Sequence, residues 1–402
     1  MSPKRGAQEE HQMQAGLIVL CLAYVLSQFF RAFLAVLASV LARDTGAAPD
    51  DLAAASGLWF LTFAAMQIPV GWALDRFGPR RTAASLLFLG GGGGAALFAM
   101  ATAPLHIKLA MLLIGVGCSP VLMASYYIFA REYPPARFAA LAALMLGVGS
   151  VGNLVASYPM ALAIDLIGWR AALAGLAAIS IAVAAGILAL VRDPAPVANG
   201  AGGSVLELLK LPVLWVIFPM MLVNYAPAAA LRGLWIGPYL EDVFGLGTVE
   251  IGQATLVMGV AMIGGTLAYG PLDRLLRTRK WVIFGGNFAA ALALGLLVAL
   301  IDTSAVLSVA LIALIGFLCA SFPVIIAHGR AFFPPHLVGR GVTLMNLFGI
   351  GGAGIAQFAS GRIHEHMAPS GTTAAYVAIF GFFGLMLLAG TLIYLFSRDS
   401  LD

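Results

Sequence analysis

Residues 71–81 read Gly-Trp-Ala-Leu-Asp-Arg-Phe-Gly-Pro-Arg-Arg and connect two long apolar stretches, near residues 52–74 and 82–102. The segment places one acid and three arginines beside a glycine and a proline, residue types that end one helix and begin the next. A degenerate copy, Leu-Asp-Arg at residues 272–274, recurs at a shift of 198 between two later apolar stretches. A charged loop repeated in this way is typical of a membrane protein built from two related halves.

The composition agrees with that interpretation. The chain is 61% hydrophobic and only 10% charged, with a mean hydropathy of +0.97. A soluble protein of this size needs far more surface charge, so lipid is the expected solvent. A membrane span needs about 20 apolar residues. Twelve such stretches lie near residues 15–42, 52–74, 82–102, 107–130, 138–164, 170–191, 212–240, 250–271, 281–301, 304–329, 341–362 and 373–396. We therefore expect an all-α polytopic membrane protein with twelve transmembrane helices.

The distribution of lysine and arginine predicts the orientation. If the N-terminus is cytoplasmic, sixteen of the 22 basic residues fall in cytoplasmic segments and four fall outside: Arg43, Lys108, Arg170 and Arg362. Both termini are thus expected in the cytoplasm, and the protein in the cytoplasmic (inner) membrane. The first stretch is too long for a signal-peptide core, so we interpret it as a retained span. The net charge of +4 then reflects topology, and a nucleic-acid partner is not expected.

The chain is an internal repeat. Arg131 precedes Pro134-Pro135, and Arg330 precedes Pro334-Pro335 at nearly the same shift. Further matches in the same order include Leu144-Met145, Gly149 and Gly152 with Leu344-Met345, Gly349 and Gly352. We expect six spans in each half, residues 1–191 and 211–402, joined by a cytoplasmic linker at 192–210. An even number of spans keeps both halves in one orientation, with substrate bound between them.

Residues 71–81 resemble the G-x-x-x-D-R-x-G-R-[RK] signature of the major facilitator superfamily, at the place between spans two and three where that family carries it. Gly168-Trp169-Arg170 resembles another of its recurrent elements. The resemblance covers the whole chain and implies a rocker-switch carrier. It also implies a gate at the cytoplasmic face, formed by Gly71, Asp75, Arg76, Gly78, Arg80, Arg81, Asp273 and Arg274. Simple positive-inside topology would explain Arg80 and Arg81 but not the aspartate.

Two departures from the family pattern bear on coupling. Met111 stands four residues before Gly115-Val116-Gly117, where the family often carries an arginine linked with proton coupling. The Gly-Pro pattern of drug antiporters is also missing from the fifth span, where Gly152-Asn153 stands instead. Both departures weaken an interpretation as a proton-driven drug exporter.

Two arginines, Arg31 and Arg232, lie inside apolar stretches in corresponding spans, the first and the seventh. A guanidinium at membrane depth costs about 2.5–3.5 kcal/mol, so its presence needs a reason. Tyr24, Gln28 and Arg31 share one helical face, and so do Tyr225, Arg232, Trp235 and Tyr239. The resemblance implies that these spans line a central cavity. Snorkelling to the interface is the alternative, above all for Arg232.

None of the eighteen acids lies in the middle of a span; Asp165 and Glu250 are at span ends. The two arginines therefore have no evident intramembrane carboxylate, and they favour an anion because guanidinium binds carboxylate and phosphate through paired hydrogen bonds. The family's organophosphate:phosphate exchangers are similar in carrying one arginine on the first span and one on the seventh. Nothing else in the sequence selects phosphate over carboxylate.

Other polar residues in the spans are weaker candidates for the cavity. His328 is the one plausible intramembrane group for proton coupling, although a lone buried histidine is more often structural. The remaining candidates, any of which could simply bridge helices, are Tyr126, Tyr127, Trp59, Gln67, Asn346 and Gln357.

Enzymatic and cofactor chemistry are not expected. The glycine patterns at 147–152 and 349–354 match a dinucleotide fingerprint, but they lie inside apolar spans with no preceding strand. The three cysteines lie within spans without a CxxC pair, so neither a metal site nor a disulfide framework is indicated. No nucleophile–base constellation is present either.

We therefore predict a secondary transporter for a small anionic solute, a carboxylate or phosphate-type compound, working as a monomer in the lipid bilayer. A proton or a counter-anion is a candidate coupling partner. An exporter of amphipathic, drug-like compounds remains an alternative, with the fifteen methionines as an adaptable lining. A sensor that no longer transports is a third hypothesis.

Overall fold

The computed structural model describes residues 3–194, 205–334 and 337–400. Every regular element in these ranges is helical, and none is a strand, so the predicted all-α fold is confirmed. The predicted linker lies partly outside the described residues, at 195–204.

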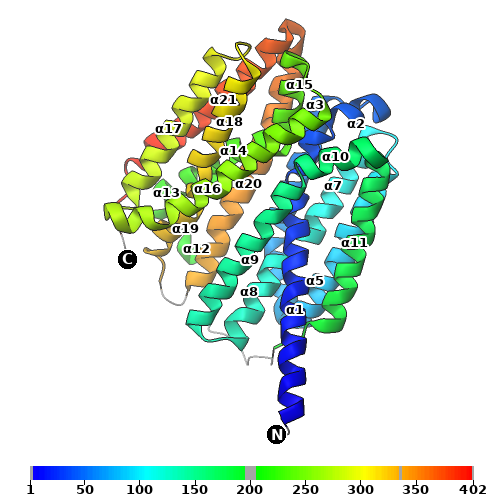
Figure 1. Cartoon of the computed structure of the whole chain (residues 1–402). Helices are drawn as coiled ribbons and strands as arrows, with labels where there is room; N and C mark the ends of the chain where they lie inside the picture. Colours follow the sequence, from blue (N-terminus) through cyan, green and yellow to red (C-terminus); the bar gives the residue numbers. More distant parts are fainter. Residues whose placement is uncertain (1–2, 195–204, 335–336, 401–402) are drawn as a thin grey trace.

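The helices before residue 192, here called the N-terminal set, correspond to the first six predicted spans (Figure 1). Their bounds are α1 (Pro3–Phe29), α2 (Ala38–Thr45), α3 (Pro49–Ala65), α4 (Gln67–Phe77), α5 (Pro79–Leu86), α6 (Gly93–Ala99), α7 (Pro104–Cys118), α8 (Pro120–Glu132), α9 (Pro135–Val155), α10 (Tyr158–Ile167) and α11 (Trp169–Leu190).

The helices after residue 204, here called the C-terminal set, correspond to the last six. Their bounds are α12 (Val205–Leu208), α13 (Leu214–Asn224), α14 (Ala226–Ala230), α15 (Ile236–Phe244), α16 (Thr248–Leu276), α17 (Lys280–Ala299), α18 (Ala305–Leu318), α19 (Phe322–Arg330), α20 (Val338–Met367) and α21 (Thr372–Tyr394). A π-helical turn, Leu231–Trp235, joins α14 to α15.

Nine helices of the described chain are long and apolar enough to cross a membrane, and two bent pairs raise the number to eleven. The bent pairs are α3–α4, at 45°, and α9–α10, at 41°. The first predicted span is interrupted. Its apolar helix ends at Phe29, and the chain continues through a 3-10 segment, Phe33–Val36, into α2. Tight i to i−3 bonds, such as Ala32 N–H to the Phe29 carbonyl at 3.0 Å, replace α-helical bonds at this break.

Proline and glycine set several helix starts, as the loop at 71–81 predicts. Gly78 has φ +84°, a conformation that other residues rarely adopt, and Pro79 then begins α5. Gly168, with φ +77°, separates α10 from α11 in the same way. We call the ends of the spans that carry the α4–α5 and α16–α17 loops the basic face, and the other ends the opposite face.

The two sets meet toward the opposite face. The main contact joins α3 to α20, where glycines allow close approach. A Cβ on Gly57 would lie 2.6 Å from the Phe358 ring, and one on Gly361 would lie 2.9 Å from Ala53 Cβ. A second contact joins α10 to the start of α16, with Gly252 against Ala161. In the described part of the chain, no comparable contact joins α4 or α8 to the C-terminal set.

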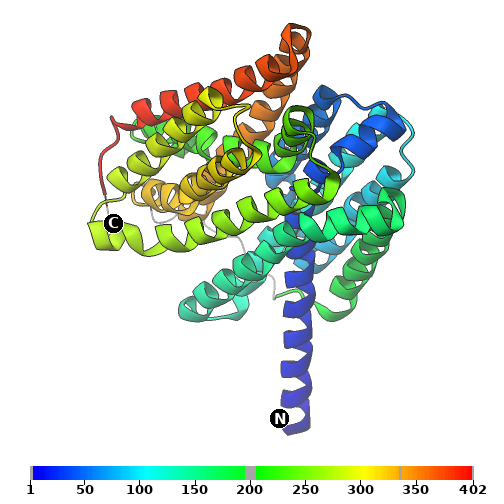
Figure 2. The same cartoon turned by 45° about the horizontal axis from the view of Figure 1, so that its top comes forward.

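Figures 1 and 2 show the N-terminal end of α1 projecting beyond the other helices on the basic side. The loop that leads from α2 to α3 lies at the opposite side, near α15 (Figure 1). The two sets are thus joined near the opposite face, where the break after α1 and the π-helical turn meet.

Candidate functional site

Arg31 lies in the break that follows α1. Its guanidinium sits over two aromatic rings of α3, with Cζ 5.3 Å from the Trp59 centroid and 4.9 Å from the Phe63 centroid. Those two rings stack on each other at 5.1 Å. Cation–π contact of this kind stabilises a guanidinium without neutralising its charge. Arg31 makes no hydrogen bond or ion pair within the described part of the chain, and its Nε is buried without a partner.

Arg232 lies in the π-helical turn and is only 3% exposed. Its Nη2 donates to the hydroxyl of Tyr225 at 3.4 Å, which is a long contact, and its Nε is buried without a partner among the described residues. The prolines and glycines of this span predict a bent helix. In the structure the α-helix changes to a π-helix there, at Leu231. Such π segments are frequent at functional sites.

The two arginines come together where the sets meet. A Cβ on Gly233, the neighbour of Arg232, would lie 3.1 Å from the Arg31 carbonyl oxygen. The Tyr225 ring, whose hydroxyl accepts from Arg232, lies 6.4 Å from that of Phe60 on the N-terminal set. Two cations contributed by different sets therefore share one region. None of the described carboxylates lies within ion-pair distance of either guanidinium.

Tyr24 and Gln28 belong to the same region. Gln28 Nε2 donates to the Tyr24 hydroxyl at 2.9 Å, and Tyr24 packs so closely on α9 that only glycine fits at Gly149. The charge of Arg31 acts on the Tyr24 hydroxyl. Tyr126 is half-buried and lies near Tyr24. The structure thus brings together Arg31, Arg232, Tyr24, Gln28 and Tyr225, with Tyr126 beside them.

Other predicted residues lie elsewhere or are already engaged. Trp235 is fully buried, and its indole N–H donates to Ser360 Oγ at 2.9 Å, so it packs the π-helical turn against α20. Tyr127 lies under the Arg131 guanidinium, 3.9 Å from its Cζ. Asn346 is half-buried on α20, and Gln67 donates to the Phe63 carbonyl at 3.0 Å. In this conformation we leave Trp235 and Tyr127 out of the site, whereas Asn346 stays a prediction.

His328 is fully buried on α19, where it contacts residues at and after the end of α21. Its Nε2 lies 2.8 Å from the Arg398 carbonyl, and its Nδ1 lies 2.5 Å from the Tyr394 hydroxyl. Both ring nitrogens are therefore used in fixing the end of α21. This geometry supports the structural alternative for His328.

Phe63 was not among the predicted site residues, although its spacing from Trp59 could have indicated it. Phe63 follows Trp59 by four residues, so both rings face Arg31 from one side of α3. Gln357 was a weak candidate, and its Nε2 donates to Ser56 Oγ at 3.0 Å across the α3–α20 contact, while its Oε1 is buried without a partner.

The predicted gate residues lie at the basic face. Asp75 is 3.8 Å from Arg131 Nη2, and its side chain is 73% exposed, so this ion pair is easily broken. Asp193, which follows α11, accepts from the Arg80 backbone N–H at 2.8 Å and occupies the space where Gly78 lacks a side chain. Arg76 lies over the Trp72 ring, Arg81 is exposed, and Gly71 faces open space.

The second copy of the loop has a matching arrangement. Asp273 pairs with Arg279 Nε at 3.2 Å, while Arg274 is exposed. Asp399, which follows α21, accepts from the backbone N–H groups of Arg279 and Lys280 and from the Thr278 hydroxyl. Partial burial opposes ionisation of Asp399, but these hydrogen bonds hold its pKa below the usual value.

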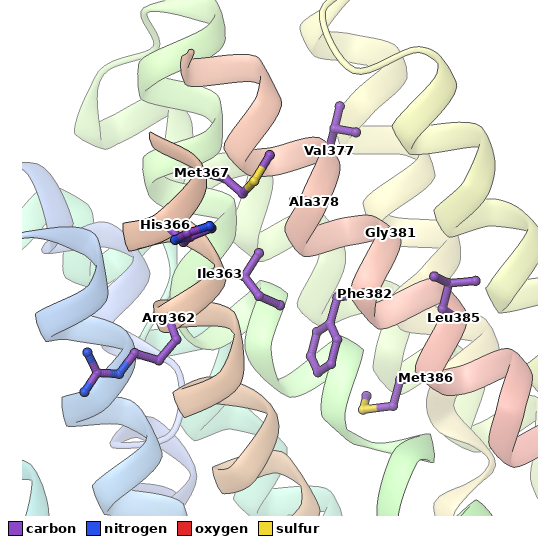
Figure 3. A pocket seen from close by; sticks show the side chains of 10 residues that line it. All are labelled: Arg362, Ile363, His366, Met367, Val377, Ala378, Gly381, Phe382, Leu385 and Met386. Carbon is purple, nitrogen blue, oxygen red and sulfur yellow. The ribbon is translucent and has the colours of Figure 1, made fainter. Parts of the chain in front are cut away.

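A groove of about 840 Å³ lies between α20 and α21 (Figure 3). Its lining is apolar except at one end, where Arg362 and His366 stand on α20. In Figure 3 the Arg362 side chain extends away from α21, and Phe382 and Met386 face the groove. This groove is separate from Arg31 and Arg232, and its lining does not match an anion site.

The family model of the Major Facilitator Superfamily matches residues 20–357. A crystal structure of a bacterial homolog of the human lysosomal transporter Spinster, inward-facing and unoccupied, aligns with a TM-score of 0.76 at 17% identity, covering 99% of this chain and 97% of that one. The D-xylose-proton symporter gives 0.77 at 16% identity, covering 96% and 98%. The nucleoside transporter NupG gives 0.73 at 16% identity, covering 95% and 98%. None of the curated proteins matches the sequence.

Proposed function

Because this chain belongs to the major facilitator superfamily and is a secondary transporter, we propose that its cargo is a small anion bound by Arg31 and Arg232. The transported class is a carboxylate or a phosphate-type compound. The solved neighbours are under 20% identical to this chain and show its fold alone, so the cargo is argued from the site.

One observation carries the proposal: Arg31 and Arg232 come from different sets that meet where Gly233 approaches the Arg31 carbonyl, and neither guanidinium has a carboxylate partner among the described residues. A buried charge is costly unless it is paired. Cation–π contact and one long hydrogen bond leave Arg31 and Arg232 with most of their positive charge unneutralised. An anionic cargo supplies the missing partner, whereas a cationic cargo is repelled.

Alternating access is part of this proposal, and the place where the two sets meet supports it. The α3–α20 and α10–α16 contacts close the route toward the opposite face, as in an inward-facing carrier. With both termini cytoplasmic, the basic face is the inner one, in the cytoplasmic (inner) membrane. Residues 1–191 and 211–402 then rock as two units, in a monomer, about the arginines. The Asp75–Arg131 pair and its neighbours form the gate at the basic face.

Uptake into proteoliposomes tests the proposal. Wild-type protein is expected to accumulate a radiolabelled carboxylate or phosphate compound, and Arg31→Ala and Arg232→Ala are expected to abolish uptake while remaining folded. Arg43→Ala is a matched control, because Arg43 is an exposed arginine near the opposite face that pairs with its neighbour Asp44. Unimpaired uptake in both arginine variants would refute the proposal. Transport of cationic dyes would instead favour an exporter of amphipathic compounds.

A further inference from the structure

Two buried polar atoms near the arginines have no hydrogen-bond partner within the described part of the chain. They are the amide oxygen Oε1 of Gln357, on α20, and the indole Nε1–H of Trp59, on α3. Both residues are at most 1% exposed. One atom is an acceptor and the other is a donor. A buried polar group without a partner costs free energy, so each of these atoms calls for a water or a ligand.

The Gln357 amide lies beside both of the segments that carry the arginines. Gly233, the neighbour of Arg232, lies in the π-helical turn. A Cβ placed on Gly233 would be 3.1 Å from the Arg31 carbonyl oxygen and 3.7 Å from Gln357 Nε2. Glycine at this position therefore lets both groups approach the turn. The Gln357 side chain belongs to the site as well as to the contact between α3 and α20.

Trp59 brings the unpaired donor to the same region. Ser56 and Trp59 are one turn apart on α3, so their side chains share a face of that helix. Gln357 Nε2 donates to Ser56 Oγ at 3.0 Å, and Cζ of Arg31 lies 5.3 Å from the Trp59 centroid. The amide of Gln357 and the indole of Trp59 thus lie over one face of α3, next to the charge of Arg31.

A hydroxyl group matches this pair of atoms, because it donates one hydrogen bond and accepts another. We infer that Gln357 and Trp59 form a hydroxyl-binding subsite and that the cargo is a hydroxylated anion, either a hydroxycarboxylate or a hydroxyalkyl phosphate. The cargo hydroxyl donates to Gln357 Oε1 and accepts from Trp59 Nε1–H, while the anionic group is bound by the arginines. The inference rests on the proposed function and narrows its substrate class.

The subsite distinguishes a hydroxyl from a methylene. A water that fills it before the cargo binds makes the same two hydrogen bonds, and a cargo hydroxyl replaces them. A methylene at the same place replaces neither, so both buried atoms lose their partners. Sites built to bind a hydroxyl therefore reject the analogue that lacks it more strongly than an apolar pocket rejects an added group. The consequence is a difference in affinity between a hydroxylated anion and its deoxy analogue of equal charge.

The test compares compounds that differ in hydroxyl groups and not in charge. Purified wild-type protein is titrated by calorimetry at pH 7.5 with lactate and propionate, with malate and succinate, and with glycerol phosphate and propyl phosphate. We expect the hydroxylated member of at least one pair to bind at least about tenfold more tightly than its deoxy analogue. The pair that responds identifies the anionic group as a carboxylate or a phosphate.

Variants assign the preference to the two residues. Gln357→Met removes the amide at similar length, and Trp59→Phe removes the indole N–H but keeps an aromatic ring under Arg31. Each is expected to reduce the preference for the hydroxylated anion severalfold. Ser56→Ala breaks the hydrogen bond between α3 and α20 but leaves both unpaired atoms in place, so it should retain the preference. Gln253→Met, at an exposed glutamine of α16, is the matched control. Thermal unfolding verifies that each variant is folded.

The outcomes separate this inference from the proposed function. Equal affinity within every pair in wild-type protein overturns the hydroxyl subsite and leaves an anion carrier. An undiminished hydroxyl preference in folded Gln357→Met or in folded Trp59→Phe also overturns it. So does an equal loss of preference in Ser56→Ala and Gln357→Met, because the effect would then come from the helix contact. Absence of binding by every anion overturns the proposed function together with this inference.

Discussion

Asp193 accepts a 2.8 Å hydrogen bond from the backbone N–H of Arg80. The bond ties the residues that follow α11 to the first turn of α5, whose N–H groups have no partners within the helix. Asp399 does the same for α17, through Lys280 N–H at 3.0 Å. In each set, an aspartate that follows the last span therefore caps the helix of the third span at the basic face.

These caps predict a loss of stability on substitution. Asp193→Ala is expected to lower the free energy of unfolding by about 1 kcal/mol, because capping interactions contribute about 0.5–2 kcal/mol. Thermal unfolding in detergent measures the change. Asp165→Ala removes an exposed aspartate of α10 and serves as the matched control. An equal effect of the two substitutions would show that the Asp193 cap contributes nothing specific.

Acid should weaken the second cap. Hydrogen bonding holds the pKa of Asp399 below its usual value, so its stabilising contribution is complete above that value and disappears as pH falls through the lowered pKa. Between pH 7 and about pH 3, the melting temperature of wild-type protein should therefore fall more than that of Asp399→Asn. Parallel pH profiles for the two proteins would contradict this assignment.

Much of the fold follows from the apolar stretches in the sequence and from the glycines and prolines that separate them. The loop at 71–81 predicts that one helix ends and another begins there, and α4 ends at Phe77 while α5 begins at Pro79. The twelve apolar stretches match the observed helices, but the first is broken around Arg31, and the second and the fifth are bent. Tight backbone bonds and the approach of Gly233 account for this break, and a hydropathy pattern contains neither.

The site was harder to derive. The repeat placed Arg31 and Arg232 in corresponding spans. Helical spacing, however, shows only which face of its helix a residue lies on, and not which residues of other helices it contacts. Trp235 shares a face with Arg232, yet its indole N–H donates to Ser360, 125 positions away. The buried His328 likewise meets Tyr394. Such partners come from packing between distant spans, and one sequence does not specify them.

His328 offers a test of structural against coupling roles. His328→Leu leaves the Arg398 carbonyl and the Tyr394 hydroxyl without this partner, so it should cost about 1–3 kcal/mol of stability. Anion affinity of the folded variant, measured by calorimetry below its melting temperature, should match wild type. Tyr394→Phe removes one of the two interactions and should cost less. Loss of anion binding in a folded His328→Leu protein would return this residue to the site.

The close approach of α3 and α20 predicts that a large side chain at Gly57 holds the opposite face open. A Cβ at Gly57 would lie 2.6 Å from the Phe358 ring and 3.1 Å from the Gly354 carbonyl, so Gly57→Leu must push α20 away. We expect slower transport and an outward shift of the conformational equilibrium. Gly147→Leu is the matched control, since nothing lies within 4 Å of a Cβ there.

Cysteine labelling reports that shift. Ala53 is fully buried in the contact, against Gly361, so Ala53→Cys in a background without native cysteines should react slowly with a membrane-impermeant maleimide. Adding Gly57→Leu should accelerate the reaction severalfold, because separation of α3 from α20 exposes residue 53 to water, whereas adding Gly147→Leu should not. If labelling at residue 53 is unchanged by Gly57→Leu in a folded protein, then α3 and α20 do not form the moving closure, and the route between the sets must be sealed by α10 and α16 instead.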